Sequence, residues 1–247
     1  MTTQTEPPID LLLVQIRQPN DPMASHEREC VVRRAGAGVR LSTRNIFTDP
    51  PRPSWTEDYR AIIIGGSGDY SVHDPRSATW VTQLRGLLDT ILTRNTPTLG
   101  ICFGHQLLAY HLGAAVNTDA NHAELGTTTV TLNAEGRRDP LMSDFGPTFD
   151  VHTGHSDHVG EVPESLQLLA SNDALPTQIF RVKGAPIYTT QFHPDLSGAE
   201  ATDRYVAYHR SLRPLEDAAP PSSLFRVGRD ESTRFIRRFL ERYAIPT

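Results

Sequence analysis

The stretch Pro97-Thr98-Leu99-Gly100-Ile101-Cys102-Phe103-Gly104-His105-Gln106-Leu107-Leu108-Ala109 decides how the rest of the chain is interpreted. Its apolar front end predicts a short buried strand, and its back end, from Gln106 to Leu112, has the residue mix of a helix. Gly100 and Gly104 flank a single cysteine, as a sharp strand-to-helix turn requires, because larger side chains two positions from the strained residue would collide. Cys102 would then lie at a helix N-terminus, where the dipole and free N–H groups favour the reactive thiolate.

An isolated cysteine in an apolar strand is usually a small buried hydrophobic residue, and this interpretation fits Cys30, to which we assign no role. Cys102 differs because the two glycines, the strand and the helix all stand where such a turn needs them. We therefore predict that Cys102 is a nucleophile.

Composition limits the classes of protein to consider. The 247 residues carry a formal net charge of −5, which gives no basic footprint for nucleic acid. No apolar run approaches the roughly 20 residues of a membrane span, and the first residues lack a signal-peptide pattern. The two cysteines cannot form a disulfide framework. We expect a cytoplasmic protein with reduced thiols that binds neither nucleic acid nor membranes.

The first half of the chain alternates between apolar runs and helical spacing. Strands are expected at 9–16, 39–46, 59–64 and immediately before Cys102, and helices at 25–35, with Ser25 as N-cap, and at 78–92. This alternation predicts a parallel sheet with right-handed crossovers, in which ligands bind beyond the carboxyl ends of the strands. Gly65-Gly66 and Cys102 both fall at such ends.

The second half is rich in short strands. They are expected at 127–132, 149–152, 166–170, 178–182 and 187–192, and the scarcity of helices between them predicts more antiparallel pairing. Helical spacing returns at 199–212 and 231–243, with a proline-rich linker at 213–223 between them. The predicted fold class is α/β, with an open, mostly parallel twisted sheet, flanking helices and a smaller antiparallel portion.

A cysteine nucleophile needs a base and a group that orients the base. His193 is the best candidate base because it follows an apolar strand and would stand at the same sheet edge as Cys102. Asp195 can curl back to accept a hydrogen bond from the other imidazole nitrogen. Acyl transfer also needs oxyanion donors, which the N–H groups of Phe103 and of the Gly65-Gly66 turn could supply.

Two motifs resemble those of class I glutamine amidotransferases. Gly100-Ile101-Cys102-Phe103-Gly104-His105-Gln106 resembles the family's Gly-x-Cys-x-Gly-x-Gln, and Gln191-Phe192-His193-Pro194-Asp195 resembles its Gln-Phe-His-Pro-Glu. Shorter matches follow in the family's order: Gly65-Gly66 with Ser71-Val72, Glu124-Leu125-Gly126, and His155-Ser156-Asp157-His158-Val159. The resemblance is closest to the glutaminase domain of GMP synthase and its stand-alone relatives. It implies a flavodoxin-like domain at 9–198 and a helical extension at 199–247.

The resemblance implies a role for each matching residue. Cys102 would attack the side-chain amide of L-glutamine, His193 would activate Cys102 and protonate the departing ammonia, and Asp195 would orient His193. The N–H groups of Gly66 and Phe103 would form the oxyanion hole. The residues that would contact bound glutamine are Gly65, Gln106, Ser156 and Asp157. A γ-glutamyl thioester would form, water would release glutamate, and no cofactor is implied.

Two features depart from the family pattern. The third triad residue is Asp195 where the family has glutamate, so the loop must bring the backbone closer to His193; Cys–His–Asp chemistry remains sound because the acid only orients and stabilises the imidazole. No synthetase domain follows in this sequence, so ammonia would pass to a separate acceptor subunit.

The segment His152-Thr153-Gly154-His155-Ser156-Asp157-His158 has the residue types of a zinc site. A His-x-His-x-Asp-His motif would need histidine where Thr153 stands, so we expect no metal here.

Three functions remain open on the sequence alone. The first is a cysteine-dependent glutaminase that serves a synthetase partner. The second is a stand-alone γ-glutamyl peptidase or hydrolase that cleaves larger γ-glutamyl amides, which the missing acceptor domain favours. The third is a non-catalytic binding or regulatory module, against which the intact Cys102, His193 and Asp195 argue.

Overall fold

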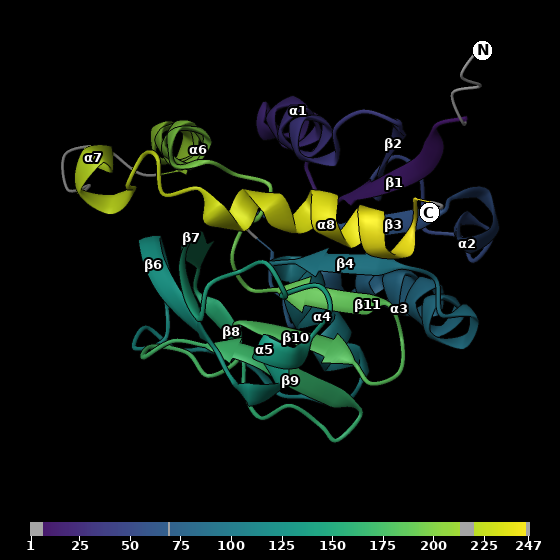
Figure 1. Cartoon of the computed structure of the whole chain (residues 1–247). Coiled ribbons are helices and arrows are strands. Elements are labelled where there is room, and N and C mark those ends of the chain that lie inside the picture. Colours follow the sequence, from purple (N-terminus) through teal and green to yellow (C-terminus); the bar gives the residue numbers. More distant parts are fainter. Residues whose placement is uncertain (1–6, 69, 213–219, 246–247) are drawn as a thin grey trace, which may run out of the picture.

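A single nine-stranded mixed sheet forms the centre of the computed structural model, which describes residues 7–68, 70–212 and 220–245 (Figure 1). Five strands run parallel, in the order β2 (Val39–Asn45), β1 (Ile9–Gln15), β3 (Ala61–Ile64), β4 (Thr98–Ile101) and β11 (Ile187–Thr190). Antiparallel strands continue the sheet beyond β11, in the order β10 (Ile179–Val182), β9 (Leu166–Ser171), β6 (Glu124–Leu132) and β7 (Thr148–His155). A separate antiparallel pair joins β5 (Val116–Thr118) to β8 (Asp157–Val159).

Two hydrophobic clusters cover the two faces of the sheet. In β1, Leu11 and Leu13 belong to one cluster, whereas Leu12 and Val14 belong to the other, and all four side chains are buried. The first cluster includes residues of α1 (Met23–Ala35) and α8 (Arg234–Tyr243), and the second includes residues of α3 (Ala78–Arg94) and α4 (Phe103–His111). Helices on both faces explain why the parallel strands are continuously apolar rather than alternating.

The predicted fold class is confirmed. The antiparallel portion extends the same sheet through the pairing of β10 with β11, so it does not form a separate layer. Further helices in the described part of the chain are α2 (Trp55–Asp58), α5 (Ala134–Arg138), α6 (Gly198–Leu212) and α7 (Pro221–Leu224).

Two helix starts differ from the sequence-based expectation. Helix α1 begins at Met23 after Pro22, so Ser25 is not its N-cap; the Ser25 hydroxyl instead donates to the Pro22 carbonyl within the first turn. Helix α4 begins directly at Phe103, without a loop after Cys102. The polar first turns of both helices hid their true starts, because local composition alone cannot fix a helix end.

The C-terminal helices pack against the rest of the chain. Phe235, Ile236, Phe239 and Leu240 of α8 are fully buried in the cluster that includes α1. Of the predicted linker at 213–223, residues 213–219 lie outside the described residues, and the remainder leads into α7. The division into a domain at 9–198 and an extension at 199–247 stays a prediction.

Two glycines let α4 lie close against the sheet. A Cβ atom on Gly104 would stand 2.3 Å from the Ile64 carbonyl oxygen, and one on Gly100 would stand 2.7 Å from the backbone of Gly104. Neither neighbour is a flexible side chain, so both contacts require glycine. The close approach fixes the start of α4 against the carboxyl ends of β3 and β4.

We expect Gly104→Ala to destabilise the protein by about 1–3 kcal/mol, because the added methyl group overpacks against the backbone of β3. Gly86→Ala is the matched control: Gly86 lies inside α3 with nothing within 4 Å of its Cβ position. The control should stabilise the protein by about 0.5–1 kcal/mol through helix propensity. Urea unfolding of both variants measures the difference, and equal stability of the two would contradict the close approach.

Candidate active site

Parallel pairing of β4 with β11 brings the two predicted motifs together. Ile101 pairs with Thr190, and the Cys102 N–H donates to the Thr190 carbonyl at 2.8 Å. Both strands therefore end at the same sheet edge, where Cys102 follows one and His193 follows the other. The N–H of His193 donates to the His152 carbonyl of β7 at 2.9 Å, which holds the loop after β11 in place.

The backbone of Cys102 has the strained geometry of a sharp turn. Its φ is 52° and its ψ is −98°, and among the described residues only Asn95 shares a positive φ without being glycine. Strained backbone of this kind occurs at active sites when the surrounding structure holds it in place. The turn leaves the side chain partly exposed at the N-terminus of α4.

His193 and Asp195 form a buried pair beside Cys102. The His193 Nδ1 atom lies 3.0 Å from Asp195 Oδ1, so its Nε2 atom is left for Cys102. Burial alone lowers the pKa of His193, but the Asp195 carboxylate and the Cys102 side chain outweigh burial and raise it to about 9. Burial alone would raise the pKa of Asp195, but Arg204 and His193 hold it well below its usual value.

The predicted oxyanion donors lie around the same point. A Cβ atom on Gly66 would stand 3.1 Å from His193 Cε1 and 3.8 Å from Cys102 Cβ, so the Gly66 backbone borders both side chains. Phe103 is the first residue of α4, where backbone N–H groups have no acceptor within the helix. The N–H of Gly65 donates instead to the Val14 carbonyl at 3.0 Å.

A cavity of about 540 Å³ opens at this edge of the sheet. Of the predicted site residues, Cys102, Gly66, Phe103, Gln106, Ser156, Asp157 and His193 line it. Gly65 and Asp195 are not among the lining residues, since Asp195 stands behind His193. The structure thus gathers seven of the nine predicted residues around one cavity.

Hydrogen bonds fix the end of the cavity away from His193. The Gln106 side chain donates to the Asp157 carbonyl at 2.8 Å, which joins α4 to β8. His155 lies 3.0 Å from the same carbonyl through Nδ1 and 3.1 Å from Glu124 Oε2 through Nε2. Burial would raise the pKa of Glu124, but hydrogen bonds from His155, Asn172 and Gln178 lower it. Ser156 and Asp157 are therefore held by a buried polar network.

The histidines of 152–158 are engaged by protein groups. His152 Nε2 lies 3.1 Å from Asp230, and the ring of His158 stacks on His122. Within the described ranges, no group of three or more histidine, cysteine or acidic side chains is placed to hold a metal ion.

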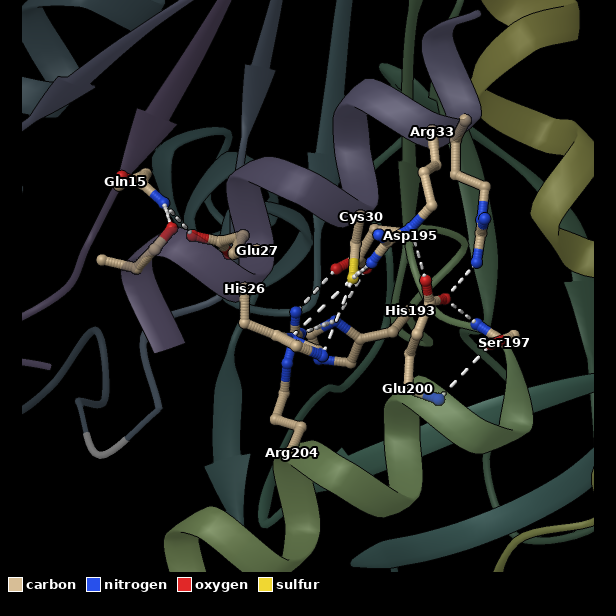
Figure 2. Close-up of polar contacts among 12 residues, drawn as sticks. Gln15, His26, Glu27, Cys30, Arg33, His193, Asp195, Ser197, Glu200 and Arg204 are labelled. Atoms are coloured by element: carbon tan, nitrogen blue, oxygen red, sulfur yellow. Dashed lines mark hydrogen bonds and ion pairs between the residues drawn. The ribbon is translucent and has the colours of Figure 1, made fainter. Parts of the chain in front are cut away.

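Sequence reasoning missed three residues of the site. Gln191 Nε2 lies 3.8 Å from Cys102 Sγ, and Glu124 holds His155, although both stand within segments that resembled the family. The third is Arg204 of α6, which donates through Nη2 to Asp195 Oδ2 at 3.0 Å (Figure 2). No motif marks Arg204 in the sequence, and only the packing of α6 brings it to Asp195.

The comparisons with known proteins agree with this geometry. A sequence profile described as "Glutamine amidotransferase class-I" matches residues 28–209. The chain belongs to this family. The resemblance noted in the two motifs is thereby confirmed.

Relatives and solved structures narrow the neighbourhood within the family. A glutamine-hydrolysing subunit of GMP synthase from Sulfurisphaera tokodaii is 33% identical over 161 residues, which cover 65% of this chain and 80% of that protein. The corresponding subunit from Methanocaldococcus jannaschii is 30% identical over 144 residues, covering 58% and 69%. A glutamine amidotransferase structure from Thermotoga maritima matches with a TM-score of 0.73 at 20% identity, covering 96% and 99% of the two chains, and supports the fold.

No helix within the described ranges combines the length and apolar character that crossing a membrane requires.

Replacing His193 should change how stability depends on pH. The folded protein holds a proton on His193 between pH 6.5 and about 9 that the unfolded chain releases. The stability from this proton is fully present below pH 6.5 and is lost as pH rises through about 9. We expect the free energy of unfolding to fall by about 1–3 kcal/mol across this window, and to fall less in His193→Gln. Urea unfolding at a series of pH values measures both slopes, and parallel slopes would contradict the raised pKa.

Proposed function

We propose that this chain hydrolyses the side-chain amide of glutamine to glutamate and ammonia, with Cys102 as the nucleophile. The observation that carries the proposal is the placement of His193, backed by Asp195, beside the strained Cys102 at one sheet edge. A cysteine with an adjacent histidine and an orienting acid is the arrangement of nucleophilic acyl transfer.

The first half of the reaction forms the acyl-enzyme. The Cys102 thiolate attacks the amide carbon, and the developing oxyanion accepts hydrogen bonds from the N–H groups of Gly66 and Phe103. His193 holds a proton at Nε2 and gives it to the departing nitrogen. The C–N bond breaks, ammonia leaves, and a γ-glutamyl thioester remains on Cys102.

The second half restores the enzyme. His193, now neutral, takes a proton from a water molecule as the water attacks the thioester carbon. The C–S bond breaks, glutamate leaves, and the thiolate again pairs with protonated His193. Asp195 keeps Nδ1 protonated throughout, so that Nε2 alone exchanges protons with substrate and water.

The substrate's amino-acid end would lie at the other end of the cavity. Gln106, Ser156 and Asp157 line that end, and their backbone is held by the network of His155 and Glu124. Gly65 would act through the turn that positions Gly66, since its own N–H is engaged by β1. A rigid amino-acid pocket places the amide carbon against Cys102.

A separate synthetase chain is the proposed recipient of the ammonia. Two relatives of this chain are named as one subunit of GMP synthase, and such a name implies that a further subunit completes the enzyme. We propose the same division of labour here, with reaction of the free chain slowed until a partner docks.

The size of the cavity supports a second candidate, the γ-glutamyl peptidase or hydrolase. At about 540 Å³ it falls within the roughly 300–1,000 Å³ of pockets for drug-sized ligands, which leaves room beyond one amino acid. Tyr205 and Tyr208 of α6 and Phe225 after α7 border it, and aromatic walls suit an apolar amine on the γ-carboxyl group. A non-catalytic module would require Cys102 to form no thioester with either class of substrate.

Ammonia release from L-glutamine by the purified chain tests the proposal. We expect Cys102→Ala and His193→Gln each to lower the rate by about 10³-fold or more, because the two residues act as one unit. Cys30→Ser is the matched control: Cys30 is fully buried on α1, and burial raises the pKa of its thiol to about 12, so its rate should match the unmodified protein.

A panel of γ-glutamyl amides, run beside glutamine, separates the candidates. Faster turnover of the larger amides would favour the hydrolase. The absence of turnover and of any Cys102 thioester with every substrate would leave the binding module.

A further inference from the structure

The loop after β11 offers His193 a carboxylate that is one methylene shorter than the glutamate of the resembling motif. Asp195 nevertheless brings Oδ1 to 3.0 Å from His193 Nδ1. Rotation about the bond to an aspartate carboxylate is soft, so one hydrogen bond does not hold its plane. A second contact on the other oxygen is needed to keep Oδ1 directed at the imidazole.

Arg204 makes that second contact. Its Nη2 donates to Asp195 Oδ2 at 3.0 Å, and its Nη1 lies 3.2 Å from His193 Nδ1 (Figure 2). The Arg204 and Asp195 side chains are 7% and 2% exposed, so the pair is almost free of competing water. A buried guanidinium fixes a carboxylate in two dimensions because its N–H groups form a rigid fork.

The start of α6 is anchored independently of Asp195. Glu200 forms ion pairs with Arg33 and Arg34 of α1 and caps the helix through the N–H of Ser197. The N–H of Gly198 donates to Asp230 at 2.8 Å. Arg204 therefore extends from a helix whose position does not depend on the contact that it makes with Asp195.

The charges around Arg204 balance only when it is present. With Cys102 as thiolate and His193 protonated, Asp195 adds a second negative charge and Arg204 a second positive one. The other titratable groups that Arg204 faces carry no charge near neutral pH: burial, then Arg204, lowers the pKa of His26, while burial raises the pKa of Cys30 to about 12 and that of Tyr208. Removing Arg204 would leave an uncompensated buried negative charge.

We propose that Arg204 is a positioning residue of the active site, which fixes the short Asp195 carboxylate so that it orients His193 as a longer glutamate would. The inference rests on the proposed cysteine chemistry. It assigns to α6 a part in that chemistry, and it explains how aspartate serves at this position.

Alkylation of Cys102 by iodoacetamide, located by mass spectrometry over a series of pH values, tests the role without any substrate. In Arg204→Gln the lost positive charge disfavours the thiolate, so the pH midpoint of alkylation should rise by about one pH unit and the rate at pH 7 should fall about tenfold. Arg204→Lys keeps the charge, so its midpoint should stay near that of the unmodified protein.

Steady-state kinetics with glutamine separate positioning from binding. We expect Arg204→Gln to lower kcat by about 10- to 100-fold with KM within about threefold, because an unfixed imidazole affects the reaction and not the amino-acid pocket. Arg204→Lys should also lose kcat, since an ammonium group cannot reproduce the fork. Arg34→Gln is the matched control, because it removes a cation that ties α1 to α6 without touching Asp195.

Each outcome decides a different claim. Alkylation and kcat in Arg204→Gln that match Arg34→Gln would overturn the role of Arg204. If Arg204→Gln does not fold, an unimpaired kcat in Arg204→Lys overturns it equally. A shifted alkylation profile in a protein that releases no ammonia would support the role of Arg204 and count against the proposed glutaminase alone.

Discussion

The hydrogen bond from the Cys102 N–H to the Thr190 carbonyl joins two segments that are far apart in the sequence. It is the last rung of the parallel ladder between β4 and β11, and it sets where both strands end. Once this register is fixed, the two residues that follow each strand can meet only at one edge of the sheet. The oxyanion turn after β3 reaches the same edge because β3 is the other neighbour of β4.

Strain at Cys102 is held by packing on both sides of the sheet. A positive φ at a residue with a side chain costs of the order of 1–3 kcal/mol, which must be offset by the surrounding structure. The closely packed Gly104 anchors the start of α4 to β3, and Phe103 and Leu107 are buried in the cluster beneath it. The turn therefore cannot relax without pulling α4 away from the sheet.

Local sequence predicted the features that depend on neighbouring residues. The glycines around Cys102 predicted the turn, and the apolar strand before His193 predicted that it would stand at a carboxyl end. Glu124 and Arg204 were not assigned parts in the site, because their contacts depend on how β6 and α6 pack against distant segments. Helix and strand periodicity indicates which face of an element is buried but not which polar group it meets there. The start of α1 was misplaced for a related reason, since no side chain caps it.

Aspartate in place of glutamate is best understood through the whole set of buried charges. A shorter acid moves the carboxylate toward the backbone of its own loop, and this opens space on its far side. In this protein α6 fills that space with the guanidinium of Arg204, which both satisfies the second carboxylate oxygen and neutralises its charge. An orienting acid that lacked such a partner would be free to turn from His193 or to take up a proton, and either change would remove its hold on the imidazole. The identity of the third triad residue and the docking of α6 are therefore one structural feature, although they lie in different parts of the chain.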